Sequence, residues 1–171
     1  MAIAEPKRLG KEPGVEEFQR TLVTAQGYCE LQMYEDALAE LDSIPSRYQH
    51  RPLVVEMRLV TLMQAKRWPD ALEFGDKLCA LRPDAGAGFI HTAFCLHELG
   101  RTAEAKKRLL SGPPTLEKEA NYFYNLACYE CVLGDLDEAR KHLARSIALD
   151  PKYREFAKGD PDLKQLRLAR K

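Results

Sequence analysis

The sequence lacks the marks of several large classes of protein. It carries no net charge, because 26 Lys and Arg residues balance 26 Asp and Glu residues, whereas proteins that bind nucleic acids or membrane surfaces usually have a basic excess. No uncharged apolar run reaches the roughly 18 residues of a membrane-spanning helix, and residues 1–14 lack the apolar core of a secretory signal. We therefore expect a cytoplasmic protein with no nucleic-acid partner and no membrane contact.

Motifs for catalysis are also missing. The four histidines form no H-E-x-x-H pattern, and no glycine-rich phosphate loop follows a strand pattern. Paired carboxylates such as Asp135 and Asp137 are explained by helix N-termini, where acidic side chains are favoured. We expect a non-catalytic protein without a cofactor.

Cysteine usage argues against a disulfide framework. The five cysteines are an odd number, and at least four lie in predicted helices, which indicates reduced, buried thiols. Cys128 and Cys131 form the one motif-like pair, but they lie inside a predicted helix without the second pair that a zinc ribbon needs. A metal or redox site at Cys128 and Cys131 is a remote alternative, and we expect packing residues and no metal.

A repeat of 34 residues dominates what is present. Four alanines recur at this spacing, and other columns align without gaps when the chain is divided into the units 18–51, 52–85, 86–119 and 120–153. A fixed period of this length is typical of stacked helical hairpins. The recurring alanines are Ala37, Ala71, Ala105 and Ala139. Each unit is predicted to contain a helix A, a tight turn and a helix B, with the small residues allowing close approach of the two helices.

Turn and cap signals agree with this division. Gly100 and Gly134 stand where helix A should end, and Pro69 suits a first helical turn. Asp135 and Glu138 resemble a capping box. Proline or Gly-Pro-Pro follows each helix B, at residues 45, 83, 112–114 and 151, so eight helices are predicted.

These residues resemble the tetratricopeptide repeat family. The likeness is strongest in the fourth unit, with Phe123, Asn125-Leu126-Ala127, Gly134-Asp135, Glu138-Ala139 and Ala148-Leu149-Asp150-Pro151. The first two units depart from the pattern: Gln32 and Lys66 replace the usual glycine, and Arg58 occupies the seventh place. The resemblance implies an all-α, right-handed superhelical solenoid of helix-turn-helix repeats.

This interpretation divides the chain into three parts. Residues 14–151 should form the four repeats, and residues 1–13 should be mobile. Residues 152–171 should form a capping segment that covers the last repeat. In that segment Asp160 reads as an N-cap, and Leu163 and Leu166 should point inward.

By resemblance, the A helices line a concave groove that binds the partner. The groove residues expected to contact it are Leu22, Gln26, Cys29, Leu53, Glu56, Met57, Val60, Met63, Ile90, Phe94, His97, Tyr124, Asn125, Cys128 and Cys131. They include no lysine or arginine, so a basic clamp for a peptide carboxylate is not expected. The face is largely apolar, which suits an amphipathic helix or an extended apolar peptide, although such residues can also pack against neighbouring A helices.

Two functions are open at this point. The first is a protein–protein interaction module, an adaptor, scaffold or chaperone-like protein that holds a peptide or helix in the groove. The second is a structural protein that assembles with copies of itself through its groove or its C-terminal leucines.

Overall fold

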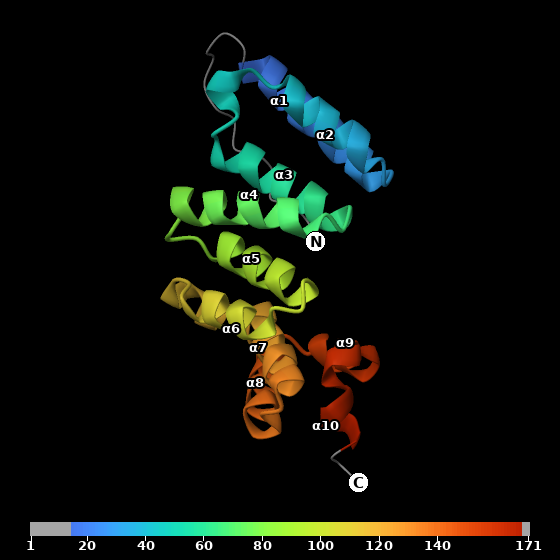
Figure 1. Cartoon of the computed structure of the whole chain (residues 1–171), viewed down its shortest axis with the longest axis vertical. Coiled ribbons are helices and arrows are strands. Elements are labelled where there is room, and N and C mark those ends of the chain that lie inside the picture. Colours follow the sequence, from blue (N-terminus) through green and yellow to red (C-terminus); the bar gives the residue numbers. More distant parts are fainter. Residues whose placement is uncertain (1–14, 169–171) are drawn as a thin grey trace.

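A computed structural model describes residues 15–168, and every regular element in this part of the chain is helical (Figure 1). The α-helices are α1 (Val15–Glu30), α2 (Tyr34–Ser43), α3 (Pro52–Gln64), α4 (Trp68–Leu81), α5 (Gly86–Glu98), α6 (Thr102–Leu110), α7 (Ala120–Leu133), α8 (Leu136–Leu149), α9 (Tyr153–Gly159) and α10 (Lys164–Leu168). Three short 3-10 helices are η1 (Ser46–Tyr48), η2 (Pro114–Lys118) and η3 (Pro161–Leu163). None of the helices in residues 15–168 is long and apolar enough to cross a membrane. The segment 1–13, expected to be mobile, lies outside the described residues.

The first eight helices form four hairpins stacked in chain order (Figure 1). Each odd-numbered helix, which is the helix A of its unit, packs on the helix B that follows it. Each helix B of the first three units packs in turn on the helix A of the next, and the A helices also contact one another in succession. Packing between sequence neighbours is the property that defines a solenoid. The predicted all-α solenoid is confirmed.

The alanine column lies where the two helices of each hairpin meet. Ala37, Ala71, Ala105 and Ala139 are all completely buried. The facing column in helix A, at the eighth place of each unit, is also completely buried and consists of Ala25, Leu59, Ala93 and Ala127. Seven of these eight residues are alanines, and their methyl side chains let the two helix backbones approach closely.

All four hairpin turns have the same backbone, whether or not they contain glycine. Gly100 and Gly134 have φ values of 76° and 92°, and Gln32 and Lys66 adopt the same left-handed conformation with φ values of 60° and 57°. In each turn the residue after this position donates its N–H to the carbonyl five residues earlier, as Met33 does to Tyr28 over 2.9 Å. This pattern is the Schellman motif. The repeat therefore imposes a left-handed residue even where the side chain opposes it.

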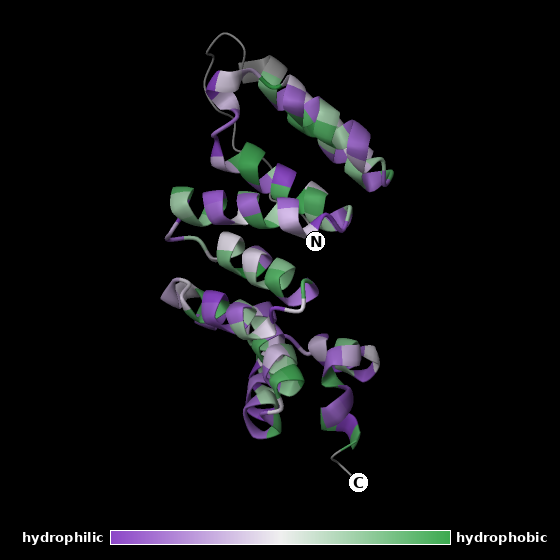
Figure 2. Cartoon of the chain, viewed as in Figure 1, coloured by the Kyte–Doolittle hydropathy of each residue, from purple (hydrophilic) through white to green (hydrophobic). Residues whose placement is uncertain are grey.

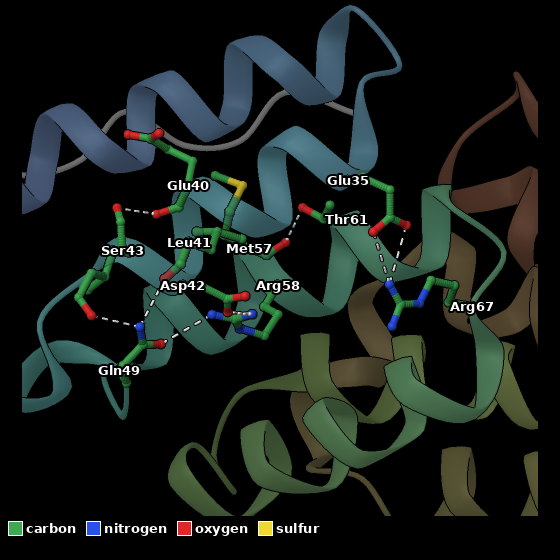
Figure 3. Close-up of polar contacts among 11 residues, drawn as sticks. Glu35, Glu40, Leu41, Asp42, Ser43, Gln49, Met57, Arg58, Thr61 and Arg67 are labelled. Atoms are coloured by element: carbon green, nitrogen blue, oxygen red, sulfur yellow. Dashed lines mark hydrogen bonds and ion pairs between the residues drawn. The ribbon is translucent and has the colours of Figure 1, made fainter.

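Arg58, which departs from the family pattern, joins the first two hairpins. Its guanidinium donates to Asp42 Oδ1 over 2.6 Å and to Gln49 Oε1 over 3.3 Å (Figure 3). Gln49 Nε2 donates to the carbonyl oxygens of Leu41 and Ile44 at the end of α2, over 2.9 and 2.8 Å. The arginine thus holds the side chain that caps α2. Arg58, which departs from the family pattern, therefore has a structural role in this chain.

The buried side chains form three clusters along the stack. The first lies in the α1–α3 region around Phe18 and Leu41, the second between α2 and α5 around Leu59, and the third from α5 to α10 around Leu126. Figure 2 shows hydrophilic and hydrophobic residues on every hairpin, as expected for helices that bury one face and expose another. The core is therefore distributed along the solenoid.

The chain after the fourth hairpin folds back onto α7 and α8. Asp160 accepts a hydrogen bond from the backbone N–H of Asp162 over 2.9 Å, as expected of an N-cap. Leu163 is 1% and Leu166 is 5% exposed, and both belong to the third core cluster. Their predicted inward orientation is confirmed. Phe156, in α9, is 55% exposed.

Candidate binding groove

The predicted groove residues lie on the A helices, and they differ in how far they are accessible. Those that are partly exposed are Gln26, Cys29, Leu53, Glu56, Val60, Met63, Ile90, Phe94, His97, Tyr124 and Asn125. Leu22, Met57, Cys128 and Cys131 are buried, and each belongs to a core cluster. In this structure these four are packing residues, and Cys128 also contacts Asp160 of the C-terminal segment.

The C-terminal end of the predicted groove is covered by the chain itself. Tyr124 Oη donates to Asp160 Oδ2 over 2.6 Å, and Cys128 Sγ donates to the same oxygen over 3.7 Å. His97 Nε2 lies 2.9 Å from Asp162 Oδ2, while His97 Nδ1 lies 3.0 Å from the hydroxyl of Thr102. Three predicted groove residues, on α5 and α7, therefore bind two carboxylates of the segment that follows α9.

The electrostatics of this contact depend on groups that keep their protons. Burial raises the pKa of Tyr124, and the hydrogen bond to Asp160 raises it further. Burial also raises the pKa of the Cys128 thiol, and the nearby carboxylates of Asp160 and Asp162 add to the effect. Both side chains are thus protonated donors at neutral pH. The Asp160 carboxylate thus accepts hydrogen bonds here from the neutral hydroxyl of Tyr124 and the neutral thiol of Cys128.

Sequence reasoning identified Asp160 only as a helix cap. Nothing in the sequence connects residue 160 with residue 124, because the contact depends on how the chain turns after Gly159. The Asp-Pro pair was the available signal, since it marks a helix start and therefore a change of direction. It did not indicate that the carboxylates face the groove.

The central part of the groove is apolar with acidic positions. The rings of Phe94 and Trp68 meet edge to face with their centroids 5.8 Å apart. Glu56 is half-buried, and burial raises its pKa while the positive charge of Arg82 opposes this shift. Glu30 and Glu98, the last residues of the A helices α1 and α5, are exposed. The described A-helix face here thus presents apolar side chains together with carboxylates.

The cysteine motif was the basis of the metal or redox alternative. Ligand atoms of Cys128, Asp160 and Asp162 lie within 4.8 Å of one another. Burial and the two nearby carboxylates raise the pKa of the Cys128 thiol, which disfavours a role as a nucleophile because the reactive form is the thiolate. Cys131 is completely buried in the core cluster. Burial also raises the pKa of Cys95 to about 11. The pair of Cys128 and Cys131 does not itself form a ligand set in this structure, because the residues gathered around Cys128 are Asp160 and Asp162.

A tetratricopeptide repeat model matches residues 120–153, which are the fourth unit. No curated protein sequence matches the chain. Among solved structures, MamA from Desulfovibrio magneticus RS-1 is similar with a TM-score of 0.72 and 17% identity, over 89% of this chain and 84% of that chain.

Two further structures share the fold. YrrB, a tetratricopeptide repeat protein with an unusual peptide-binding site, is similar with a TM-score of 0.64 and 14% identity, over 91% of this chain and 89% of that chain. PcrH, solved in complex with the chaperone-binding region of PopB, has a TM-score of 0.53 and 24% identity, over 66% of this chain and 85% of that chain. The fourth unit thus matches the tetratricopeptide repeat family, and the solved structures share the helical fold of the larger part of this chain.

Proposed function

We propose that this chain is a protein–protein interaction module that binds a peptide or helix along the first three A helices of its groove. One observation carries the proposal: Leu53, Val60, Met63, Ile90 and Phe94 are partly exposed on the adjacent helices α3 and α5. Apolar side chains that stay accessible along one face are typical of a surface that binds another protein.

The charged residues on the A helices indicate which kind of segment would bind there. Glu30, Glu56 and Glu98 supply carboxylates on α1, α3 and α5, and the predicted groove positions contain no lysine or arginine. The end of the groove on α7 already holds Asp160. A segment with apolar anchors and basic residues therefore suits the free part, because opposite charges raise specificity and the rate of association.

The solved relatives are consistent with this use of the fold. YrrB has a peptide-binding site, and PcrH was solved with a binding region of another protein. Both likenesses concern the fold alone at these identities. The proposal for the present chain rests on its own groove residues.

The test is to select binding peptides for the full chain from a displayed random library and to measure their affinities. Replacing Met63 and Phe94 by alanine should weaken binding by ten-fold or more. Each replacement removes an apolar side chain that the bound peptide would bury, and such a loss costs about 1 to 2 kcal/mol of binding free energy. Leu110→Ala is the matched control, since Leu110 is 53% exposed on the helix B face of the third hairpin. Peptides that bind the double variant as tightly as the original chain would overturn the proposal.

A second measurement tests the charge argument. Selected peptides should be enriched in lysine or arginine, and Glu56→Gln should weaken their binding more at low salt than at high salt. Peptides rich in acidic residues would contradict the assignment of a basic partner.

A further inference from the structure

A cluster of potential metal ligands lies where the C-terminal segment meets the fourth hairpin. The thiol of Cys128 on α7 and the carboxylates of Asp160 and Asp162 have ligand atoms within 4.8 Å of one another. Cys128 is 5% exposed, and both aspartates are partly buried. Asp160 follows Cys128 by 32 residues. The cluster therefore exists because the chain folds back after α9, and it does not include Cys131, the partner that the sequence spacing suggested.

The spacing of sulfur and oxygen in the cluster fits a metal ion. Cys128 Sγ lies 3.7 Å from Asp160 Oδ2. Zinc bonds of about 2.3 Å to sulfur and about 2.0 Å to oxygen, at a tetrahedral angle, hold two such atoms about 3.5 Å apart. A zinc ion therefore fits between them in place of the thiol proton. The Asp162 carboxylate supplies a third ligand atom.

The charge of the cluster also favours a cation. Within residues 15–168, neither Asp160 nor Asp162 forms an ion pair with a lysine or arginine. Arg167 donates instead to the backbone carbonyl oxygens of Ala157 and Asp160, over 2.8 and 2.7 Å. Two carboxylates beside a buried thiol repel one another when ionised, and a divalent cation removes this repulsion. Sulfur and carboxylate donors together suit zinc better than magnesium or calcium.

A buried hydroxyl beside the cluster independently indicates a ligand. Tyr129 is 1% exposed, and its hydroxyl has no hydrogen-bond partner in the part of the chain that the structure describes. Its ring packs against His97, with the ring centroids 4.9 Å apart. Burial raises the pKa of Tyr129, and the charges of Cys128 and Asp162 raise it further, so the hydroxyl lies near both. Because buried hydroxyls are nearly always hydrogen-bonded, a group that binds beside Cys128 and Asp162 would satisfy this one.

Hydrogen bonds hold both carboxylates in the way that outer partners hold metal ligands. His97 Nε2 lies 2.9 Å from Asp162 Oδ2, and His97 Nδ1 lies 3.0 Å from the Thr102 hydroxyl. An ionised carboxylate only accepts hydrogen bonds, so Nε2 carries the proton. The Tyr124 hydroxyl donates to Asp160 Oδ2 over 2.6 Å. Such bonds orient the carboxylates and leave their remaining lone pairs for a metal ion.

We propose that Cys128, Asp160 and Asp162 bind one zinc ion at the end of the groove. The ion takes the place of the Cys128 thiol proton, which is released, and it coordinates the thiolate and one oxygen of each aspartate. A water molecule fills the fourth position and forms a hydrogen bond with the Tyr129 hydroxyl. The ion joins the C-terminal segment to α7. This site is separate from the apolar surface of α3 and α5 that carries the proposed function, so either proposal can fail without the other.

The first experiment measures metal binding to the full chain. Protein stripped with a chelator is titrated with zinc by calorimetry, and cobalt(II) serves as a spectroscopic probe of the ligands. We expect one ion per chain and, with cobalt, a sulfur-to-metal charge-transfer band, which requires a bound thiolate. Zinc should also slow amide hydrogen exchange in residues 160–168, because it ties this segment to α7. Absence of binding, or cobalt binding without the charge-transfer band, would overturn the proposal.

Conservative variants locate the ion. Cys128→Ser and Asp162→Asn should each weaken zinc binding by about 100-fold or more, because losing even an outer partner of a ligand costs about 10- to 100-fold. Cys131→Ser is the matched control: it removes the other thiol of the same helix and should leave the affinity unchanged. An equal loss in C131S would assign the ion to the cysteine pair and overturn the proposal. Asp162→Asn, at a side chain that is 33% exposed, decides the question if circular dichroism shows that C128S is misfolded.

Tyr129→Phe separates a hydroxyl that serves the metal site from one that is only buried. In the metal-free chain this change removes an unpartnered polar group, so stability in urea should be unchanged or higher. Zinc binding should nevertheless weaken by about ten-fold, because the metal-bound water loses its hydrogen-bond partner. Unchanged zinc affinity in Y129F would overturn the assignment of the fourth position.

Discussion

The left-handed turns of the first two hairpins allow a quantitative test of the repeat. Gln32 and Lys66 have φ values of 60° and 57°, in turns whose hydrogen bonds match those of Gly100 and Gly134. A non-glycine residue costs about 1 to 2 kcal/mol in this conformation. Glycine avoids that cost but loses about 0.5 to 1 kcal/mol more backbone entropy on folding. Each replacement by glycine should therefore stabilise the chain by about 0.5 to 1 kcal/mol.

The assay is urea unfolding followed by circular dichroism. The two turns lie in different hairpins, so their effects should add, and Q32G/K66G should gain about 1 to 2 kcal/mol with an unchanged m-value. For a domain of this size that gain corresponds to a rise in Tm of about 2 to 8 °C. Both side chains are exposed, so few contacts are lost with them.

Alanine at the same two positions is the control that isolates the backbone. Q32A/K66A removes the side chains but keeps the unfavourable φ, so it should bring little or no stabilisation. If the alanine and glycine variants gained equally, the benefit would come from the lost side chains. If the glycine variant were less stable than the original chain, the argument from backbone strain would be refuted.

Three further predictions concern packing, pH and the C-terminal segment. Gly75→Ala should lower the free energy of unfolding by about 1 to 3 kcal/mol, because the added Cβ would lie 2.3 Å from the buried Thr92 hydroxyl. Gly27→Ala, where the added Cβ meets no atom within 4 Å, should be neutral or stabilising in the same urea assay. Burial lowers the pKa of His91, so the unfolded chain binds the proton more readily and the free energy of unfolding should fall as the pH drops below about 6.5. His91→Gln should flatten this pH dependence between pH 7.5 and 5.5. An unchanged pH dependence in the variant would contradict the role assigned to His91. Asp160→Ala leaves the half-buried Tyr124 hydroxyl without its acceptor. It should therefore lower the free energy of unfolding by about 1 to 3 kcal/mol and speed amide hydrogen exchange in residues 160–168. Unaltered exchange would show that the segment is held by its leucines alone.

Period and punctuation were sufficient to predict the architecture. Helix α4 begins with Trp68 and Pro69 in its first turn, and Asp135 accepts from the N–H of Glu138 over 3.1 Å, as the sequence indicated. Such features are local, because a cap or a turn depends on residues a few places apart. Because the four units align position by position, a local feature predicted in one unit could be expected at the same place in the others.

Contacts outside the repeat pattern were not predictable in the same way. Arg58 appeared as a departure from the family, and only the structure shows that it joins Asp42 to Gln49. The groove prediction counted positions along helix A, and one of the positions that it selected, Cys131, is completely buried. How closely adjacent A helices approach depends on side-chain volumes in three dimensions, and a column of positions does not contain that information.

The C-terminal segment shows how the end of a repeat array acquires two different faces. Asp160 and Asp162 turn toward α5 and α7 and bind His97 and Tyr124 in the groove. Because α9 stops after 7 residues, the same segment leaves α8 partly uncovered on its other side. One early helix end therefore closes the groove at the fourth hairpin and opens a hollow beyond it. Because the same segment contacts both surfaces, a change that releases Asp160 should alter both of them together.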